Sequence, residues 1–297
     1  MTAFCHRVAQ LPVLGLGIST EYGAANTPEA LDTLALHEAY PAYAAFLEIG
    51  IEAGRGIDES ARQWVERGLP TTYHFLDVNL DESEDFDPPW MTAVAEIAAH
   101  IQPAWMCGDA GLWHFGRRER GHMLLLPPIL SADAARGQVE GIVRLREQLG
   151  YEVFPENPPG HAYIGPMHLL EFYANVVEQA DTGMLLDCAH LAMYQQYMGY
   201  APCTGLEAFP LDRIVELHVA GSAPKEHQGF VYWDDAHTPE VLSATWQIFE
   251  WVVSRTPHLK AVVFECERNT LDSVLPVFQR IAALLAETTL TARGAHQ

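Results

Sequence analysis

Short apolar segments that resemble β-strands recur along the whole chain and alternate with segments of helical pattern. The expected strands span residues 13–19, 45–51, 71–78, 104–109, 151–156, 182–187, 213–219 and 261–265. Such alternation is typical of βα units, which assemble parallel sheets. Eight units in 297 residues, without a Ser/Gly-rich linker, predict an α/β fold with a single (β/α)8 TIM-barrel domain over residues 1–297. We expect roughly the last ten residues to form a flexible tail.

Two of the intervening segments carry clear helix signals. In "GQVEGIVRLREQLG" (137–150), Val139, Ile142 and Leu149 fall on one face of a helix, as in an amphipathic helix that packs on a sheet. In "HTPEVLSATWQIFEWVV" (237–253), Thr238 is a suitable N-cap and Pro239 suits the first helical turn. The second segment is therefore expected to begin its helix at about Pro239.

Most of the expected strands end on a side chain that can ligate a metal ion. These residues are Glu48, His74, Asp109, Glu156, Asp187, His218 and Glu265. Any one of them alone could be a hydrogen-bonded core residue or a helix cap. In TIM barrels, however, the chemistry collects at the C-terminal ends of the strands, so the whole set favours a shared site there. A carboxylate such as Asp187, at the end of a buried apolar run, is costly unless a partner offsets its charge.

Two short motifs extend this set of candidate ligands. "LLDCAH" places His190 three positions after Asp187, and "DDAH" contains Asp235-x-His237. In an extended segment, alternate residues point the same way, so Asp235 and His237 could occupy adjacent coordination positions. Imidazoles and carboxylates suit iron, zinc or manganese, and no cysteine is needed.

The nine candidates other than Glu48 are too many for one ion: His74, Asp109, Glu156, Asp187, His190, His218, Asp235, His237 and Glu265. We therefore expect two or three ions, bridged by a carboxylate such as Glu156 or Glu265. Glu52 and Glu267 could orient the ligands from behind. His114 is ambiguous, because it could reach the same cavity from the loop after the fourth strand.

Charge and cysteine content limit the function classes. The net charge of -22 argues against a nucleic-acid partner, because each phosphate contact would meet a repulsive field. No apolar stretch approaches the ~20 residues that span a bilayer, and the N-terminus lacks the pattern of a signal peptide. The five cysteines include no C-x-x-C pair and are expected to be reduced thiols in a cytoplasmic protein.

Six segments of the chain resemble the DUF692 family of multinuclear non-haem iron-dependent oxidases. They are "FLEIGIEAG", "FPENPPGHAY", "TGMLLDCAHLAM", "LDRIVELHVAG", "DDAHTPEV" and "VVFECERN". This resemblance implies a xylose-isomerase-like TIM barrel with two or three iron ions. It also implies O2-dependent oxidation of a residue, most often cysteine, in a ribosomally synthesised precursor peptide. A separate partner protein that recognises a leader peptide is implied as well.

The family's site residues carry over onto this sequence. The implied metal ligands are His74, Asp109, Glu156, Asp187, His190, His218, Asp235, His237 and Glu265. Among them, Asp109, His190 and His237 are expected to act in catalysis. Glu48, Glu52, Asn157 and Glu267 are expected to support the ligands.

The chain departs from the usual family pattern at three places. Gly50 and Ala110 stand where family members usually have histidines, which leaves the substrate open. His190 stands where the family usually has an asparagine, and imidazole is the stronger donor. This change also resembles endonuclease IV, which would make the protein a zinc-dependent phosphodiesterase. A sugar isomerase and a non-catalytic binding module are weaker alternatives.

Overall fold

A computed structural model describes residues 3–27, 30–117 and 124–294. Eight parallel strands close into a barrel in the order β1-β10-β7-β6-β5-β4-β3-β2. They are β1 (Gly15–Glu21), β2 (Leu47–Ile51), β3 (Thr71–Phe75), β4 (Met106–Asp109), β5 (Val153–Glu156), β6 (Met184–Asp187), β7 (Ile214–Ala220) and β10 (Ala261–Glu265). The predicted (β/α)8 TIM barrel is confirmed, and each strand overlaps the segment expected from the sequence.

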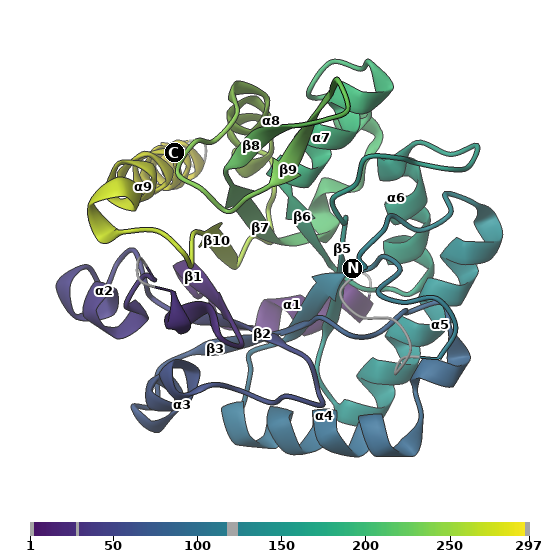
Figure 1. The fold of residues 1–297 in the computed structure, drawn as a ribbon, viewed down its shortest axis with the longest axis horizontal. Coiled ribbons are helices and arrows are strands. Elements are labelled where there is room, and N and C mark those ends of the chain that lie inside the picture. The colour runs from purple at the N-terminus through teal and green to yellow at the C-terminus, as the bar shows by residue number, and fades with distance from the viewer. Residues whose placement is uncertain (1–2, 28–29, 118–123, 295–297) are drawn as a thin grey trace.

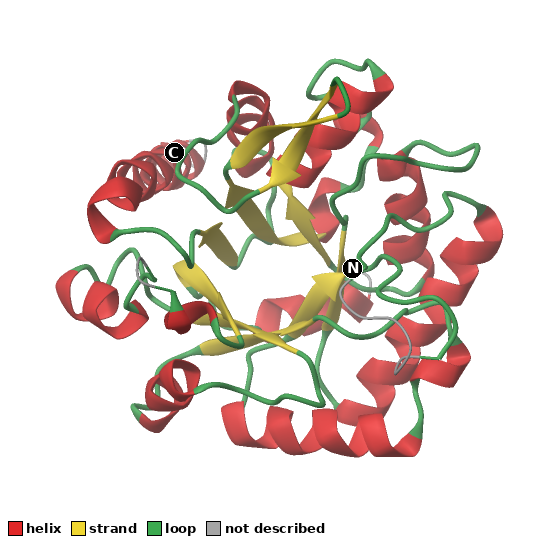
Figure 2. Cartoon of the chain, viewed as in Figure 1, coloured by secondary structure: helices red, strands yellow, loops and turns green. Residues whose placement is uncertain are grey.

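Helices surround the barrel, as Figure 1 and Figure 2 show. They are α1 (Ala3–Gln10), α2 (Thr33–Ala39), α3 (Glu59–Glu66), α4 (Pro88–Ile101), α5 (Ala132–Leu149), α6 (Leu169–Gln179), α7 (Cys188–Met198), α8 (Ser243–Val253) and α9 (Leu271–Gly294). The pattern in residues 137–150 correctly indicated α5, which buries Ile142 and Leu145. Helix α9 continues to Gly294, into the segment expected to be a tail, and residues 295–297 lie outside the described residues.

The core has two parts because barrel side chains alternate between the outside and the inside. The larger part lies between the strands and the surrounding helices. The smaller part includes Phe46, Trp105 and Phe154, and α1 adds Phe4 and Val8 to it. In Figure 1, α1 lies within the outline of the barrel. It therefore packs against the inner core and leaves the strand C-termini open.

An antiparallel hairpin interrupts the regular alternation after β7. Its strands, β8 (Ser222–His227) and β9 (Phe230–Asp235), pair with each other in a separate two-stranded sheet. In Figure 1 the hairpin lies between α7 and α8. It ends at Asp235, one of the predicted ligands.

The expected start of the next helix was wrong. Helix α8 begins at Ser243, and its N-cap is Leu242 rather than Thr238. Backbone hydrogen bonds from Ala236 N to Gly221 O (3.2 Å) and from Ser222 N to Glu240 O (3.3 Å) hold the preceding segment against the end of β7. These tertiary contacts override the local helix signals of Thr238 and Pro239, because the segment has to return from the hairpin to the barrel.

Within the described residues, no helix combines the length and the apolar character that crossing a membrane requires.

Candidate metal centre

The strand ends bring the predicted ligands together at one end of the barrel. Strand register places Asp109 beside Glu156 and Asp187 beside His218. The strand-end residues Glu48, His74, Asp109, Glu156, Asp187, His218 and Glu265 are all at most 7% exposed. Several of them line a cavity of about 190 Å³, whose apolar wall includes Leu76, Trp113 and Leu125. The cavity combines ionisable and apolar surfaces, as ligand-binding sites usually do.

Glu156 occupies the middle of the cluster. Its Oε2 lies 2.7 Å from His74 Nε2, and its Oε1 lies 3.5 Å from both His190 Nδ1 and His218 Nδ1. A carboxylate with imidazoles facing both oxygens can bridge two ions. Either Glu156 or Glu265 was expected to bridge two ions, and Glu265 also has an imidazole at each oxygen, with His218 Nδ1 3.4 Å from its Oε1 and His237 Nε2 3.7 Å from its Oε2.

The three-residue spacing of Asp187 and His190 has a local cause. Asp187 ends β6 and is the N-cap of α7, and its carboxylate accepts a hydrogen bond from His190 N at 2.6 Å. The first turn of α7 therefore returns His190 to the cavity. There the ring's Nδ1 lies 2.9 Å from Asn157 O, and its Nε2 lies 3.0 Å from Asp235 Oδ2. Asn157 also exchanges two 3.0 Å hydrogen bonds with the backbone of Asp187.

The Asp235–His237 pair reaches the site by a different conformation from the one expected. His237 is not extended: its φ is +48°, in the left-handed region that is costly for a residue other than Gly, Asn or Asp. Asn269 Nδ2 donates a 2.7 Å hydrogen bond to His237 O and so supports this backbone. His237 Nε2 then lies 3.2 Å from Asp235 Oδ2 and 3.7 Å from Glu265 Oε2.

Glu267 holds the opposite side of the His237 ring. Its Oε2 lies 2.9 Å from His237 Nδ1, and its Oε1 accepts a hydrogen bond from Ser19 Oγ. A carboxylate that accepts the Nδ1 proton fixes the tautomer and leaves Nε2 as the coordinating atom. This geometry is the one expected of a residue that orients a ligand.

The electrostatics of the cluster favour a cation. Burial raises the pKa of Asp109 to about 7 and that of Asp187 to about 6. The pKa of His218 is also raised: burial opposes its charge, but the charges of Glu48, Glu265 and Glu156 outweigh burial. Asp109 and His218 thus both retain protons near neutral pH, because the site concentrates negative charge in a buried volume.

Several buried atoms of the cluster also lack hydrogen bonds within the described part of the chain. They are Asp109 Oδ1, Asp187 Oδ2, His218 Nδ1, Asp235 Oδ1 and Glu265 Oε2. Buried polar atoms are normally satisfied, so a group of orphaned atoms within one cluster of side chains indicates a missing partner. Their oxygen and nitrogen donors fit a transition-metal ion.

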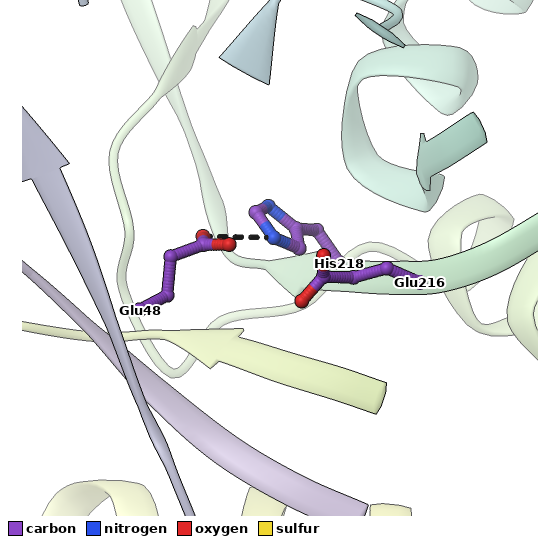
Figure 3. Close-up of side chains that lie close together, drawn as sticks. All are labelled: Glu48, Glu216 and His218. Carbon is purple, nitrogen blue, oxygen red and sulfur yellow. Dashed lines mark ion pairs between the residues drawn. The ribbon is translucent and has the colours of Figure 1, made fainter. Parts of the chain in front are cut away.

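His218 also lies beside a second layer of buried polar residues, of which Figure 3 shows Glu48 and Glu216. His218 Nε2 lies 3.0 Å from Glu48 Oε1, while Glu48 Oε2 accepts hydrogen bonds from Thr72 Oγ1 and Cys107 Sγ. Burial tends to raise the pKa of Glu48, but the charge of His218 outweighs it and lowers that pKa to about 2. Glu48 therefore carries its negative charge directly behind a predicted ligand.

Two predicted or ambiguous residues lie elsewhere. Glu52 was expected to support the ligands, but its carboxylate forms an ion pair with Arg55 at 2.8 Å. His114 does not reach the cavity: its Nε2 lies 2.8 Å from Asp85 and its Nδ1 lies 2.8 Å from Gly116 O. Gly50, which stands where the family usually has a histidine, lines the cavity. Ala110 is fully buried, and its carbonyl accepts hydrogen bonds from the side chains of neighbouring helices.

Several supporting residues were not predicted from the sequence. Ser19, Cys107, Glu216 and Asn269 carried no recognised signal. Ser19 acts through a hydrogen bond to Glu267, which is remote from it in sequence. Asn269 acts through a hydrogen bond to the unusual backbone of His237. Glu216 lies two residues before His218 on β7, so strand alternation could have placed both side chains inside the barrel.

Fold and cluster together define the class of the protein: a TIM barrel whose strand ends carry a buried set of potential metal ligands. The chain belongs to the family described as RiPP precursor modification enzyme MbnB/TglH/ChrH, whose model matches residues 26–288. The resemblance to the DUF692 family is thereby confirmed.

Curated relatives are UPF0276 proteins. One from Anaeromyxobacter sp. (strain Fw109-5) is 28% identical over 203 residues, which cover 67% of this chain and 69% of the relative. Another, from Caulobacter vibrioides, is 28% identical over 235 residues, covering 77% and 78%.

Solved structures support the fold. A xylose isomerase-like TIM barrel protein from Mycobacterium smegmatis, in complex with magnesium, has a TM-score of 0.58 at 9% identity and covers 95% of this chain and 98% of its own. Endonuclease IV from Thermus thermophilus has a TM-score of 0.53 at 17% identity, covering 92% and 99%. At these identities the likeness concerns the barrel alone.

Proposed function

We propose that this protein is a multinuclear iron-dependent oxidase that uses O2 to modify a residue, most often cysteine, of a ribosomally synthesised precursor peptide. Membership of a family of precursor-modification enzymes supports the peptide substrate. The observation that carries the metal assignment is the position of Glu156 between His74, His190 and His218. A leader-peptide recognition protein would act as the partner that delivers the substrate.

The side chains divide into groups that would each hold an ion. Three such groups are His74–Asp109–Glu156, Glu156–Asp187–His190 and Asp187–His218–Glu265. Glu156 and Asp187 each belong to two groups, as bridging carboxylates would. Asp235 and His237 would complete the coordination from the hairpin side. Bound iron would supply the redox chemistry for the reaction of the substrate with O2.

The protein's own residues bind, orient and exclude water. Asn157 and Glu267 fix the rings of His190 and His237 through their Nδ1 atoms. The apolar side chains of Leu76 and Trp113 keep part of the cavity wall dry and suit a small side chain of the substrate. We assign Asp109, His190 and His237 to catalysis, because all three line the cavity in which the substrate would meet the metal.

Zinc-dependent phosphodiester hydrolysis is the competing function. His190 favours it, because a set this rich in imidazole also suits zinc. The net charge of -22 argues against this function, since the phosphates of a nucleic-acid substrate would be repelled.

Metal analysis combined with an oxygen assay separates these functions. Protein purified without oxygen should bind two or three iron ions per chain and consume O2 when a precursor peptide is added. Glu156→Gln should lose bound iron and activity, whereas Glu52→Gln should retain both, because Glu52 pairs with Arg55 away from the cluster. Stoichiometric zinc with phosphodiesterase activity and no O2 uptake would refute the oxidase proposal.

A further inference from the structure

The polar layer beside His218 has an unsatisfied buried atom of its own. Glu48, Glu216 and His218 are at most 1% exposed, and each offers a ligand atom within 4.8 Å of the other two. Figure 3 shows the three side chains gathered together, with Glu48 directed at the His218 ring. Ligands that share an ion at about 2.1 Å lie no more than about 4 Å apart, so small side-chain shifts would suffice to close this set.

Hydrogen bonds account for only part of this layer. Trp105 Nε1 donates to Glu216 Oε2 at 2.7 Å, but Glu216 Oε1 has no hydrogen-bond partner among the described residues. His218 Nε2 forms an ion pair with Glu48 Oε1 at 3.0 Å. Among the described residues, Glu216 Oε1 is thus a fully buried carboxylate oxygen without a hydrogen bond, and it lies beside a second carboxylate and an imidazole.

Cys107 lies beside the two carboxylates of this layer. Cys107 Sγ lies 3.1 Å from Glu48 Oε2, and its thiol also interacts with Glu216. One imidazole, one thiol and two carboxylates form a mixed nitrogen, sulfur and oxygen set. Such a set suits a four-coordinate zinc-type ion, whereas Ca²⁺ and Mg²⁺ prefer oxygen ligands alone.

We propose that Glu48, Glu216, Cys107 and His218 Nε2 bind a further divalent transition-metal ion, of the zinc type, in the barrel interior. This site lies below the strand-end cluster, with which it shares His218, and it goes beyond the proposed oxidase activity. A charge of +2 would offset the burial of two carboxylates, and Glu48 also lines the cavity, which gives the ion a route of entry.

The two sites would share His218. Its Nδ1 faces Glu156 and Glu265, at 3.5 and 3.4 Å, while its Nε2 faces Glu48. Coordination through both nitrogens requires the charged His218 ring to lose both of its protons, and coordination by Cys107 requires loss of the thiol proton. These protons leave to solvent as the ion enters, so binding at the deeper site releases protons.

Cobalt(II) is the probe that tests this site, because a cobalt–thiolate bond gives a charge-transfer absorption that carboxylates and imidazoles do not. The full chain loaded with cobalt should show this band, and Cys107→Ser should abolish it. Cys188→Ser and Cys266→Ser are matched controls, since each of these buried cysteines follows a predicted ligand of the upper cluster. Both controls should keep the band.

Metal content gives the second readout. Glu216→Gln keeps an oxygen for Trp105 and removes the free carboxylate atom, so it should bind one ion per chain fewer than the wild-type protein. Asp235→Asn should weaken binding at the upper cluster and keep the thiolate band. Circular dichroism of each variant checks folding.

Absence of the thiolate band in the wild-type protein, with equal metal content in Glu216→Gln, would overturn the proposal. A band that disappears in Cys188→Ser or Cys266→Ser instead would also overturn it. Either result leaves the oxidase proposal intact, because that proposal fails on iron content and O2 uptake.

Discussion

Glu267 should contribute to metal affinity although it is not assigned as a ligand. It accepts a hydrogen bond from His237 Nδ1 at 2.9 Å and is held in turn by Ser19. A hydrogen bond to a charged group is worth about 1.5–3 kcal/mol, and a neutral one about 0.5–1.5 kcal/mol. Glu267→Gln can keep a neutral hydrogen bond, so the expected loss is about 1–1.5 kcal/mol, or roughly tenfold in the dissociation constant of the metal.

Removing the side chain should cost more. Glu267→Ala leaves His237 Nδ1 without its acceptor, and the ring is only 26% exposed, so water replaces the contact incompletely. The expected weakening is nearer 100-fold, the upper range for residues that support metal ligands. The assay is competition with a chelator of known affinity under nitrogen, using iron and zinc in turn.

Glu52→Gln is the matched control for both variants, because Glu52 is also a carboxylate that the sequence placed behind the ligands. Its metal affinity should equal that of the wild-type protein. If Glu267→Gln and Glu267→Ala both bind metal as tightly as Glu52→Gln, then Glu267 does not orient His237 and the reasoning from hydrogen-bond geometry is refuted.

Further predictions follow from the charges and the packing of the cluster. Metal affinity should fall as the pH drops through 7 and then 6. The reason is that Asp109 and Asp187 have raised pKa values of about 7 and 6 and take up protons that compete with the ion. A titration between about pH 8 and 5 that shows constant affinity would contradict this prediction. Gly221→Ala should displace the segment that carries Asp235 and His237, because an added Cβ would lie 1.9 Å from Thr238 O. We expect the free energy of unfolding to fall by about 1–3 kcal/mol, measured by denaturant titration. Metal binding should also be weaker, measured by metal analysis.

The sequence predicted the barrel well because its local signals agree with the tertiary structure. Strands such as β6 are short apolar runs whose position depends on burial, and burial follows directly from residue type. Parallel register then brings strand ends to one side, so the polar residue that ends each strand meets the others there. Glu156 and Asp187 could be assigned to a shared site for this reason.

The incorrect predictions concern residues at which the chain leaves regular secondary structure. Alternation from Glu48 and Gly50 would place Glu52 inside the barrel, but β2 ends at Ile51 and the chain turns at once, with Arg55 N donating to Glu52 O. The residues next to His237 in the sequence also did not predict its left-handed backbone conformation. That conformation depends on Asn269, 32 residues further along the chain.

The hairpin after β7 gives the site an unusual dependence on a segment outside the barrel. Asp235 and His237 come from its end, whereas their partners His190 and Glu265 belong to α7 and β10. An ion held by both sets would act as a cross-link between remote parts of the chain, and it would reduce the freedom of the segment from Gly221 to Val241 much as a covalent bond does. Metal loading would then be readable as protection of this segment against proteolysis.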